Sequence, residues 1–413
     1  MNEQLIVKNF GPIKDATVDF KKVTVFIGPT GGGKSTLAKL AAILKDPEFY
    51  SASEGKEFEF FANYSIKTYF QTNTHITWEN NNDSILIMND KIGVSESLKN
   101  KIDSITEDTN DALIKNLVHR LQNIVTEQNI NLEIKEDIDF LKNELDKLIT
   151  ENIFAPIYKA GIAPYRPSYI PSERSFVPAI EYSWAGLMRD DIGLPKQILN
   201  FANSFSTSRK YVPELNIDFF DVKYLHINGQ DYIKIPEREE PLRLFETASG
   251  IQSVTPLLVL LTHLLQDSDQ TQSFIIEEPE LNLYPTAQRD LVYTLLEKCT
   301  QGNNALTITT HSPYVLAALN LCLYAHKIKE LFPHQARKVN KLIPEKYWVS
   351  PREFSAYYVA GGGVKSIFDD KTGLLSESQL DEVSGEFADI FDRLTDLRVP
   401  EKKTLAKAKS AKK

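Results

Sequence analysis

The sequence has few cysteines and no long apolar run. Only Cys299 and Cys322 are present among 413 residues, and their spacing is not C-x-x-C. This excludes a disulfide framework and a cysteine-based zinc site, and it favours buried thiols in a reducing compartment. No apolar run approaches the ~20 residues that a bilayer span needs, and residues 1–4 lead into a strand rather than a secretory signal. We therefore expect a cytoplasmic protein with no membrane span.

The sequence also lacks an excess of positive charge. It has 47 Lys and Arg against 56 Asp and Glu, for a net charge of −9. A surface that is basic all over, as DNA wrapping favours, is therefore excluded, although a local basic groove is compatible with this total. The last stretch, 402–413, is rich in Lys and Ala and has no acid. It is either a nucleic-acid arm or a solvated terminus, and the second interpretation is favoured.

A glycine-rich segment directly follows the apolar run Val23–Ile27. Its residues match the pattern G-x-x-x-x-G-K-S and are Gly28, Pro29, Thr30, Gly31, Gly32, Gly33, Lys34, Ser35 and Thr36. In such a loop, backbone N–H groups surround the β-phosphate, the lysine reaches the β- and γ-oxygens, and the serine hydroxyl binds Mg²⁺. A helix expected over 34–45 directs its positive end at the same anion. A simple glycine turn is the alternative, but the order strand, loop, helix favours a nucleotide site.

A second apolar strand, Ser273–Ile276, ends on consecutive acids. Glu277 is expected to hold Mg²⁺ or its water shell, and Glu278 to orient and polarise the water that attacks the γ-phosphate. Solvated acids at a strand end are the alternative. A third strand, Ala305–Thr310, ends on His311 after a helix expected over 286–300. A parallel β-α-β unit places this histidine beside Glu278, where it can sense the γ-phosphate, whereas a lone histidine is usually structural.

Polar residues precede an apolar helix expected over 254–265. Ser249, Gly250 and Gln252 offer a hydroxyl, a backbone N–H and an amide to a phosphate. An ordinary helix cap has a similar composition, so the position of the segment ahead of the acidic strand is what favours a binding role.

The remaining segments predict supporting structure. Two hairpins are expected, one over 75–88 and one over 222–235, and a helix over about 192–210. Apolar repeats within 96–152 predict a pair of antiparallel helices, either a short projection or helices packed on the domain. Prolines between 163 and 175 exclude a long helix there.

These elements, in this order, resemble the ATPases of the ABC superfamily, close to the ATP-binding half of OLD-family proteins and their RecF- and SMC-like relatives. The resemblance covers about 1–40 and 240–320. Residues 248–252 correspond to the signature motif L-S-G-G-Q, and His311 to the switch histidine. The string 277–285 resembles E-E-P-E-x-x-L-H-P. Two residues depart from the pattern, because Tyr284 replaces a histidine and Ile251 replaces the second signature glycine. The string Ile170–Ser175 also resembles the I-P-A-E-R-S string of these ATPases, whose role the sequence does not reveal.

The resemblance implies an α/β fold, namely an ABC-type P-loop ATPase head with an antiparallel β subdomain and a helical insertion. It implies ATP and Mg²⁺ as ligands and a head-to-head homodimer, with higher oligomers left open. In that dimer, Ser249 of one subunit covers ATP held by the other. Gln71 is a candidate Mg²⁺-sensing glutamine, although a polar glutamine at a strand end is common.

The implied role is that of a stand-alone ATPase whose ATP-linked dimerisation controls a separate effector, a nuclease or toxin, as in antiphage defence. The alternative is a RecF-like repair clamp on DNA, which a basic groove beside the helical insertion would favour. A transporter engine fits the 96–235 insertion poorly. A self-sufficient nuclease is the least favoured, because no Toprim-like pattern of acids follows His311.

Five regions are expected along the chain. They are an ATPase lobe with the phosphate-binding loop (1–95), the helical insertion (96–152), a mixed α/β connection (153–240), the part of the head with signature, acids and histidine (241–325), and a helical cap with a basic tail (326–413).

Overall fold

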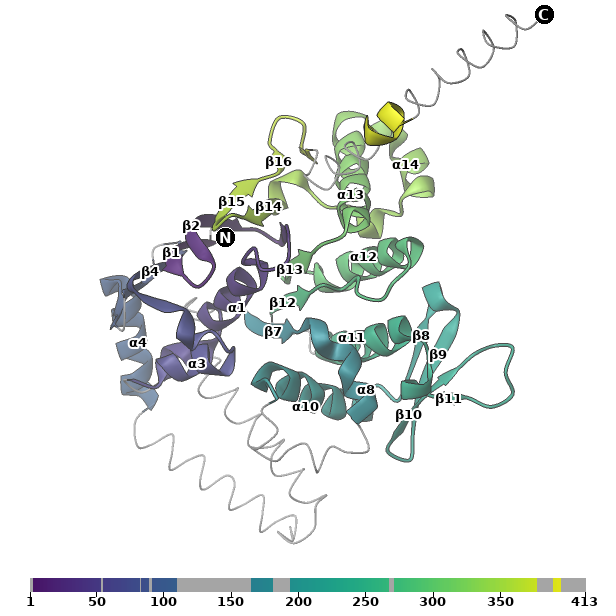
Figure 1. Cartoon of the computed structure of the whole chain (residues 1–413), viewed down its shortest axis with the longest axis horizontal. Helices are drawn as coiled ribbons and strands as arrows, with labels where there is room; N and C mark the ends of the chain where they lie inside the picture. Colours follow the sequence, from purple (N-terminus) through teal and green to yellow (C-terminus); the bar gives the residue numbers. More distant parts are fainter. Residues whose placement is uncertain are drawn as a thin grey trace, which may run out of the picture.

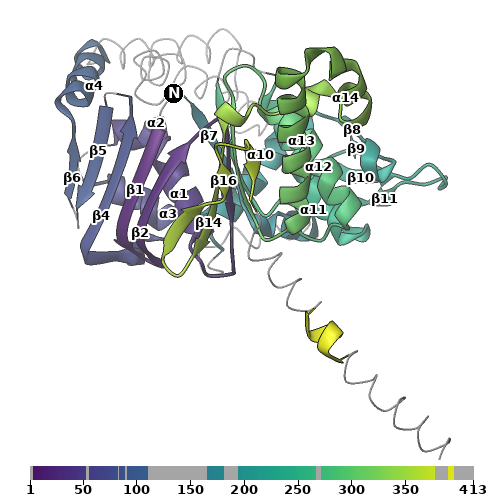
Figure 2. The ribbon, with the colours of Figure 1, turned by 90° about the horizontal axis from the view of Figure 1, so that it is seen from above.

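The structure is a computed structural model that describes residues 3–52, 55–81, 83–88, 91–109, 165–180, 194–266, 271–376 and 389–394. An 11-stranded sheet runs through it, with helices against both faces (Figure 1, Figure 2). One part of the sheet is parallel and the other is mainly antiparallel. This confirms the α/β class and the antiparallel β subdomain.

The parallel part carries the strands that were expected to hold the site. Its strands, in spatial order, are β14 (Phe354–Ala360), β3 (Val23–Ile27), β13 (Ala305–Thr310), β12 (Gln272–Glu277) and β7 (Arg166–Ile170). Nearly every residue of β3, β12 and β13 is buried. Strands covered on both faces read as continuous apolar runs, and this is why these three stand out in the sequence.

The antiparallel part extends from the other side of β14. Its strands, in order from the sheet edge, are β6 (Lys91–Val94), β5 (Asp83–Met88), β4 (Phe70–Asn80), β1 (Glu3–Phe10), β2 (Ile13–Phe20) and β15 (Gly363–Ser366). The hairpin expected over 75–88 is confirmed as β4 and β5, which pair antiparallel from His75 to Asn80. Helix α4 (Glu96–Thr109) follows β6. The rest of the expected helical insertion lies outside the described residues.

Helices cover the two faces of the sheet with separate apolar clusters. In β3, Val25 and Ile27 pack in a cluster with α10 (Lys196–Tyr211), α11 (Ser249–Leu264), α12 (Pro285–Cys299) and α13 (Pro313–Leu331). Phe26, which lies between them, packs on the opposite face with α1 (Lys34–Leu44). The two-residue period of a strand sends alternate side chains to opposite faces, so β3 joins both clusters. Shorter helices are α2 (Pro47–Ser51), α3 (Glu57–Asn63), α8 (Val177–Ile180) and α14 (Ala336–Leu342).

A smaller sheet lies beside α10 and α11. Its strands are β11 (Leu242–Arg243), β10 (Gln230–Lys234), β9 (Val222–Ile227) and β8 (Glu214–Ile217). The hairpin expected over 222–235 is confirmed as β9 and β10. Buried Asp231 accepts hydrogen bonds from Tyr224 at 2.6 Å and from Arg209 of α10 at 2.8 Å. The carboxylate therefore ties this sheet to the helix layer.

The C-terminal region departs from the expected helical cap. Residues 354–360 form β14, next to β3 in the centre of the sheet, and β16 (Phe368–Asp369) pairs with β17 (Leu374–Leu375). The expectation of helix over this stretch was wrong, because Phe354–Ala360 is an aromatic and apolar run that fits a buried strand. Residues 389–394 are helical, and the basic tail lies outside the described residues. Within the described parts of the chain, none of the helices combines the length and apolarity required to cross a membrane.

Candidate nucleotide site

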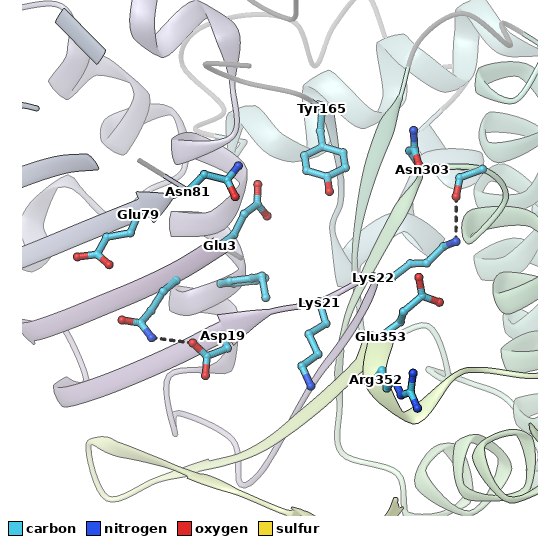
Figure 3. Close-up of a pocket in the computed structure, with 13 residues that line it drawn as sticks. Glu3, Asp19, Lys21, Lys22, Glu79, Asn81, Tyr165, Asn303, Arg352 and Glu353 are labelled. Atoms are coloured by element: carbon cyan, nitrogen blue, oxygen red, sulfur yellow. Dashed lines mark hydrogen bonds between the residues drawn. The ribbon is translucent and has the colours of Figure 1, made fainter. Parts of the chain in front are cut away.

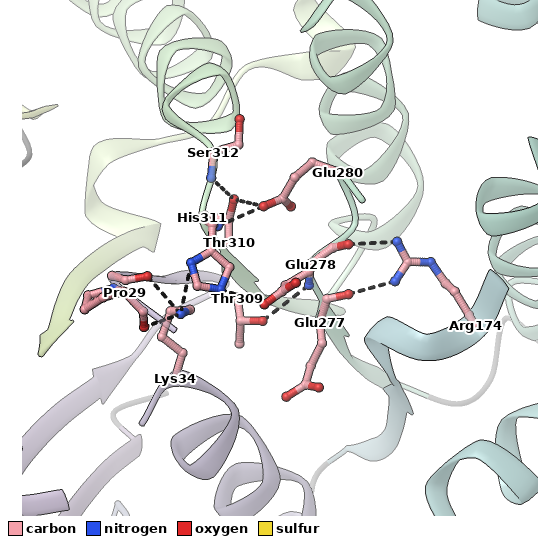
Figure 4. Close-up of polar contacts among 11 residues, drawn as sticks. Pro29, Lys34, Arg174, Glu277, Glu278, Glu280, Thr309, Thr310, His311 and Ser312 are labelled. Atoms are coloured by element: carbon pink, nitrogen blue, oxygen red, sulfur yellow. Dashed lines mark hydrogen bonds and ion pairs between the residues drawn. The ribbon is translucent and has the colours of Figure 1, made fainter. Parts of the chain in front are cut away.

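Strand register brings the expected site residues to one edge of the sheet. Glu277 pairs with Thr309, and Thr310 pairs with Ile27. The residues that immediately follow these strands therefore meet at the carboxyl edge, where ligands bind in open α/β sheets. Figure 4 shows Lys34, Glu278 and His311 converging there from α1 and from the ends of β12 and β13.

The phosphate-binding loop, 28–33, has a shape that requires glycine at two points. Gly28 has φ 150° and Gly33 has φ 108°. A Cβ atom on Gly28 would lie 2.3 Å from the Val359 carbonyl oxygen of β14, and one on Gly33 would lie 2.4 Å from Ile13 Cδ1. The tip of the loop, Pro29–Gly31, is exposed, whereas Lys34 and Thr36 are buried in the first turn of α1. The exposed tip of the loop therefore presents its backbone to solvent, and the rest of the loop packs closely against Val359 of β14 and against Ile13.

Lys34 connects the loop to the other two strands. Its Nζ donates to the carbonyl oxygens of Gly28 at 2.9 Å and Pro29 at 3.0 Å, and it lies 3.4 Å from His311 Nδ1. Burial lowers the pKa of Lys34, while the nearby carboxylates of Glu278, Glu280 and Glu277 oppose that change. The site therefore holds a buried ammonium group among three acids.

His311 bridges Lys34 and Glu278. Its Nε2 lies 2.8 Å from Glu278 Oε1, with the two side chains 33% and 22% exposed. An ammonium group can only donate, so Nδ1 of His311 is the acceptor of any hydrogen bond from Lys34. Such a bond goes with the Nε2–H tautomer, which can donate to the Glu278 carboxylate. The expectation that His311 lies beside Glu278 is met by this geometry.

Glu278 has a strained backbone. Its φ is +40°, in a region that residues other than glycine seldom adopt. Its N–H donates to the Thr309 carbonyl oxygen at 2.9 Å. Strain of this kind costs ~1–3 kcal/mol and persists only where the surroundings impose it. The turn after β12 is therefore held in a conformation that directs the Glu278 carboxylate toward His311.

Arg174 is the main residue that holds this turn. It follows β7 and is fully buried, with 0% exposure. Its Nη1 donates to the carbonyl oxygens of Pro171 at 3.2 Å and Glu277 at 2.8 Å, and its Nη2 to those of Glu278 at 2.8 Å and Pro279 at 3.0 Å. Burial lowers the pKa of Arg174 to about 10, so the guanidinium is charged at neutral pH. Four carbonyls thus converge on one planar cation.

Sequence reasoning assigned no role to Arg174. The only signal was the string Ile170–Ser175, which resembles one that recurs in related ATPases. The contacts give it a role, because three of the four carbonyl acceptors belong to the residues around Glu278. Arg174 is a positioning residue, since its side chain hydrogen-bonds the backbone that orients the acid.

Arg174→Lys is expected to lower the turnover number for ATP ~10- to 100-fold while leaving ATP affinity within a few-fold of the original. A lysine keeps the charge but cannot reach four acceptors, and a misplacement of about 1 Å can cost ~100-fold in rate. Steady-state hydrolysis and equilibrium nucleotide binding measure the two quantities separately.

Arg209→Lys is the matched control, because Arg209 is largely buried and ties α10 to strand β10 through Asp231 at 2.8 Å. Both variants should lose stability in thermal denaturation, by ~1–3 kcal/mol for each buried group left without a partner. Only the Arg174 variant should lose turnover. Equal turnover in the two variants would show that Arg174 acts only in folding.

Glu280 holds the neighbouring strand end. Its Oε1 accepts from the Thr310 hydroxyl at 2.6 Å and from the His311 backbone N–H at 2.8 Å. Burial raises the pKa of this carboxyl, and the two hydrogen bonds oppose the change. These two hydrogen bonds of Glu280 therefore hold the end of β13 and set the position of His311. Its signal in the sequence was the acid two residues after Glu278, for which no role was predicted.

Glu277 has an environment that fits a divalent cation. It is 5% exposed, and its Oε1 has no hydrogen-bond partner. Burial raises the pKa of Glu277, while the nearby hydroxyls of Ser35 and Tyr169 and the charge of Lys39 lower it. A buried, unpaired carboxylate oxygen beside a serine hydroxyl is a fitting pair of Mg²⁺ ligands. Among the described residues, no group of three His, Cys, Asp or Glu side chains is placed to hold a metal, so the phosphates would have to complete the shell.

The signature-like residues begin α11, five residues earlier than expected. Gly250 packs against the turn after the acids, since a Cβ there would lie 2.9 Å from the Asn282 carbonyl oxygen. Ser249 is exposed, and the N-cap residue is Ala248, whose side chain caps nothing. The ordinary-cap alternative for Ser249 is therefore not met. The expected amide donor, Gln252, instead directs its Nε2 to the carbonyl oxygens of Phe245 at 3.0 Å and Thr247 at 2.7 Å, so this amide shapes the turn before the helix.

Gln71 is the second residue of β4, and its backbone N–H donates to the Thr74 hydroxyl at 2.7 Å. The Gln71 side chain is exposed. Its Mg²⁺-sensing role stays a prediction.

A separate cavity of about 710 Å³ lies at the opposite edge of the sheet (Figure 3). Its walls carry charges of both signs, including Glu3, Asp19, Lys21, Lys22, Glu353 and Arg352. Glu3 is neutralised by Lys45 at 2.8 Å. The cavity lies at the amino ends of the parallel strands, so it is distinct from the nucleotide site.

The match to a known protein family agrees with these features. The family model described as "AAA ATPase domain" matches residues 1–143 and 62–316, which include the loop, the acids and His311. Among solved structures, the SMC head domain from Thermotoga maritima is 12% identical, with 89% of this chain and 98% of that chain covered and a TM-score of 0.37. The recombination mediator protein RecF-ATPrS of the RecFOR pathway is 8% identical, with 89% and 98% covered and a TM-score of 0.33. A search of curated proteins gave no significant match in sequence.

Proposed function

This chain belongs to the AAA ATPase domain family, and from that premise we propose that it binds ATP with Mg²⁺, dimerises head to head on ATP, hydrolyses it and thereby regulates a separate effector. The observation that carries the proposal is the contact series from Lys34 through His311 to Glu278, at 3.4 Å and 2.8 Å. It joins the phosphate-binding loop to the acid expected to act on water.

Each residue of the series has a distinct part in hydrolysis. Lys34 exchanges the Gly28 and Pro29 carbonyl oxygens for the β- and γ-phosphate oxygens of ATP. His311 then donates through Nε2 to Glu278 or to the γ-phosphate, and so reports the state of the nucleotide. Glu278 orients and polarises the attacking water. Mg²⁺, held by Ser35 and Glu277 and sensed by Gln71, would neutralise charge on the phosphates.

Exposed groups around the site support a composite dimer. Ser249 is exposed at the first turn of α11, whose N–H groups have no side-chain cap and can donate to an anion. Tyr284, which follows the acids, is 77% exposed, and tyrosine is enriched where proteins associate. We propose that Ser249 and Gly250 of one subunit cover ATP bound to the loop of the other. Gln252 supports that helix entrance through its backbone contacts.

The effector part of the proposal rests on the resemblance of the string 277–285 to OLD-like ATPases that act in antiphage defence. The partner class is a nuclease or toxin whose activity follows the ATP-closed dimer. A Glu278→Gln dimer locked on ATP is the bait that tests it. Specific retention of a nuclease or toxin from the source cells, only with ATP, supports regulation of an effector. Retention of duplex DNA alone would favour the repair-clamp alternative.

Mixed dimers test the composite site directly. Lys34→Ala and Ser249→Arg subunits should each be inactive alone and regain part of the hydrolysis when mixed. One of the two sites in the mixed dimer then has both an intact loop and an intact signature. Differential tags show how much mixed dimer has formed, and hydrolysis is measured on that fraction.

Two other outcomes bear on the composite site. If mixed dimers form but stay inactive, the two sites are either obligately coupled or not shared between subunits. If Ser249→Arg homodimers hydrolyse ATP normally, Ser249 has no role across the dimer. Asn216→Arg, a replacement of the same kind on β8 of the small sheet, controls for the added charge.

A further inference from the structure

Helix α13 carries an apolar stripe on its exposed side. Its members recur at three- and four-residue spacing and are Tyr314, Ala317, Leu321, Tyr324, Ile328 and Leu331. We call this set the α13 stripe. Tyr314, Leu321, Tyr324 and Leu331 are 48–60% exposed, although α13 buries a different face in the core. Large apolar side chains in a continuous row on the surface mark an interaction site.

The C-terminal segment has the same spacing in its sequence. Between 380 and 397, six of the apolar residues recur at intervals of three and four, while Ala388 and Phe391 lie off this row. The six are Leu380, Val383, Phe387, Ile390, Leu394 and Leu397. Residues 389–394 are helical, and there Ile390 and Leu394 are 52% and 60% exposed. Two helices with this repeat can pack along each other, knobs into holes. Each row spans two to three heptads, which is short for an isolated coiled coil, so support from the folded domain is needed.

Charge complements the apolar match. The segment 377–397 has seven acids and one base. The region of α13 and α14, 313–342, has five bases and one acid, and Arg337, Lys338 and Lys341 of α14 are exposed. Opposite charges favour pairing of the segment with α13, whereas like charges disfavour pairing of two α13 helices or of two segments.

The position of the C-terminal segment indicates which copy of the chain it contacts. The last described residues before it are tied to α13, because the Leu375 N–H donates to Asn320 Oδ1 at 3.0 Å, beside Leu321. Yet helix 389–394 stands away from the body of its own chain (Figure 2), with its apolar side chains exposed. One chain therefore leaves Ile390, Leu394 and the exposed side chains of the α13 stripe in water, and a second copy can cover them at once.

We propose that the segment 380–397 of one copy packs on the α13 stripe of a second copy, and that the exchange is reciprocal. A two-fold interface of this kind repeats the same contact twice. It needs no nucleotide, and it lies outside the loop and signature residues. It is therefore independent of the ATP-linked dimer, and the two together would link chains into higher oligomers.

The test is the mass of the full chain in solution without nucleotide and with EDTA, measured by sedimentation equilibrium at micromolar concentration. Wild type should be dimeric. Leu321→Asp with Tyr324→Asp, and Ile390→Asp with Leu394→Asp, should each raise the dimer dissociation constant at least 30-fold. Leu342→Asp, on α14 and 81% exposed, is the matched control and should leave the dimer intact. Thermal denaturation confirms that the variants fold, since the changed side chains lie outside the core.

A mixture of the two double variants is the more discriminating experiment. Each homodimer has no intact contact, but the heterodimer keeps one, so a heterodimer should form where neither variant associates alone. A monomeric wild type would overturn the proposal, as would a dimer that survives removal of 377–413. A monomer in which Arg393 resists trypsin until Leu321 and Tyr324 are replaced would assign the segment to its own chain instead. The Ser249→Arg variant should still form this nucleotide-independent dimer. A failure of the proposed α13 interface can therefore be distinguished from a failure of the ATP-linked dimer.

Discussion

Glu278→Gln is expected to lower the ATP turnover number at least ~100-fold, because a positioned general base typically contributes ~100- to 10,000-fold. The amide keeps the shape of the side chain and can still meet His311 Nε2, whose separation from the carboxylate is 2.8 Å. It cannot polarise water as a carboxylate does. ATP should therefore stay bound, and the closed dimer should accumulate. Single-turnover hydrolysis and nucleotide-dependent changes of mass measure the two effects.

Glu297→Gln is the matched control for this change. Glu297 is an acid on α12, partly exposed and paired with Lys346 at 2.8 Å, and its replacement should leave turnover within two-fold. If Glu278→Gln keeps near wild-type turnover, another residue activates the water. If Glu278→Gln loses ATP binding as well, Glu278 contributes mainly to binding ATP rather than to the hydrolysis step.

Lys34→Ala is expected to raise the dissociation constant for ATP at least ~30-fold, since loss of one partner of a buried charge pair costs ~2–5 kcal/mol. Lys34 is 4% exposed, and no other residue of the loop carries a positive charge. Without it, the phosphates would face Glu277, Glu278 and Glu280 with one compensating cation fewer. Equilibrium titration with a fluorescent ATP analogue, with and without Mg²⁺, measures the loss.

The control for Lys34→Ala is Lys8→Ala, an exposed lysine on β1, which should bind ATP as the wild type does. Undiminished affinity in the Lys34 variant would contradict the phosphate-loop assignment. Loss of affinity accompanied by unfolding would leave the assignment in place only if Lys34→Arg, which keeps the charge, folds and recovers part of the affinity.

The parts of the site that could be predicted are those set by local sequence. The loop 28–33 has its glycines where backbone must pass close to Val359 and Ile13, and the apolar strands before Gly28, Glu277 and His311 are visible as runs. Because parallel strands end at a common edge, the order of these segments was enough to place His311 beside Glu278. Helix ends were predicted to within a residue for α1 and α12, where apolar periodicity is clear.

Other parts could not be predicted because they depend on packing between distant segments. Arg174 follows a strand about 100 residues before Glu278, and only the pairing of β7 with β12 brings it to the turn. Likewise, β14 was expected to be helical, and its place beside β3 follows from a pairing across more than 300 residues. Helix α11 begins at Ser249, five residues early, and the mainly polar residues 249–253 gave no local sign of it, because Gly250 packs against Asn282, which lies about 30 residues further along the chain.

Residue types at short spacing set the chemistry of the site, namely a phosphate-binding loop, an acid pair and a histidine at strand ends in an α/β chain. How these groups are held depends on contacts between segments that lie far apart in the chain. The strained φ of Glu278, the four carbonyls on Arg174, the Glu280 link to His311 and the exposed stripe of α13 all arise from which segments become neighbours. Burial and orientation are properties of the packed whole, so no local pattern encodes them.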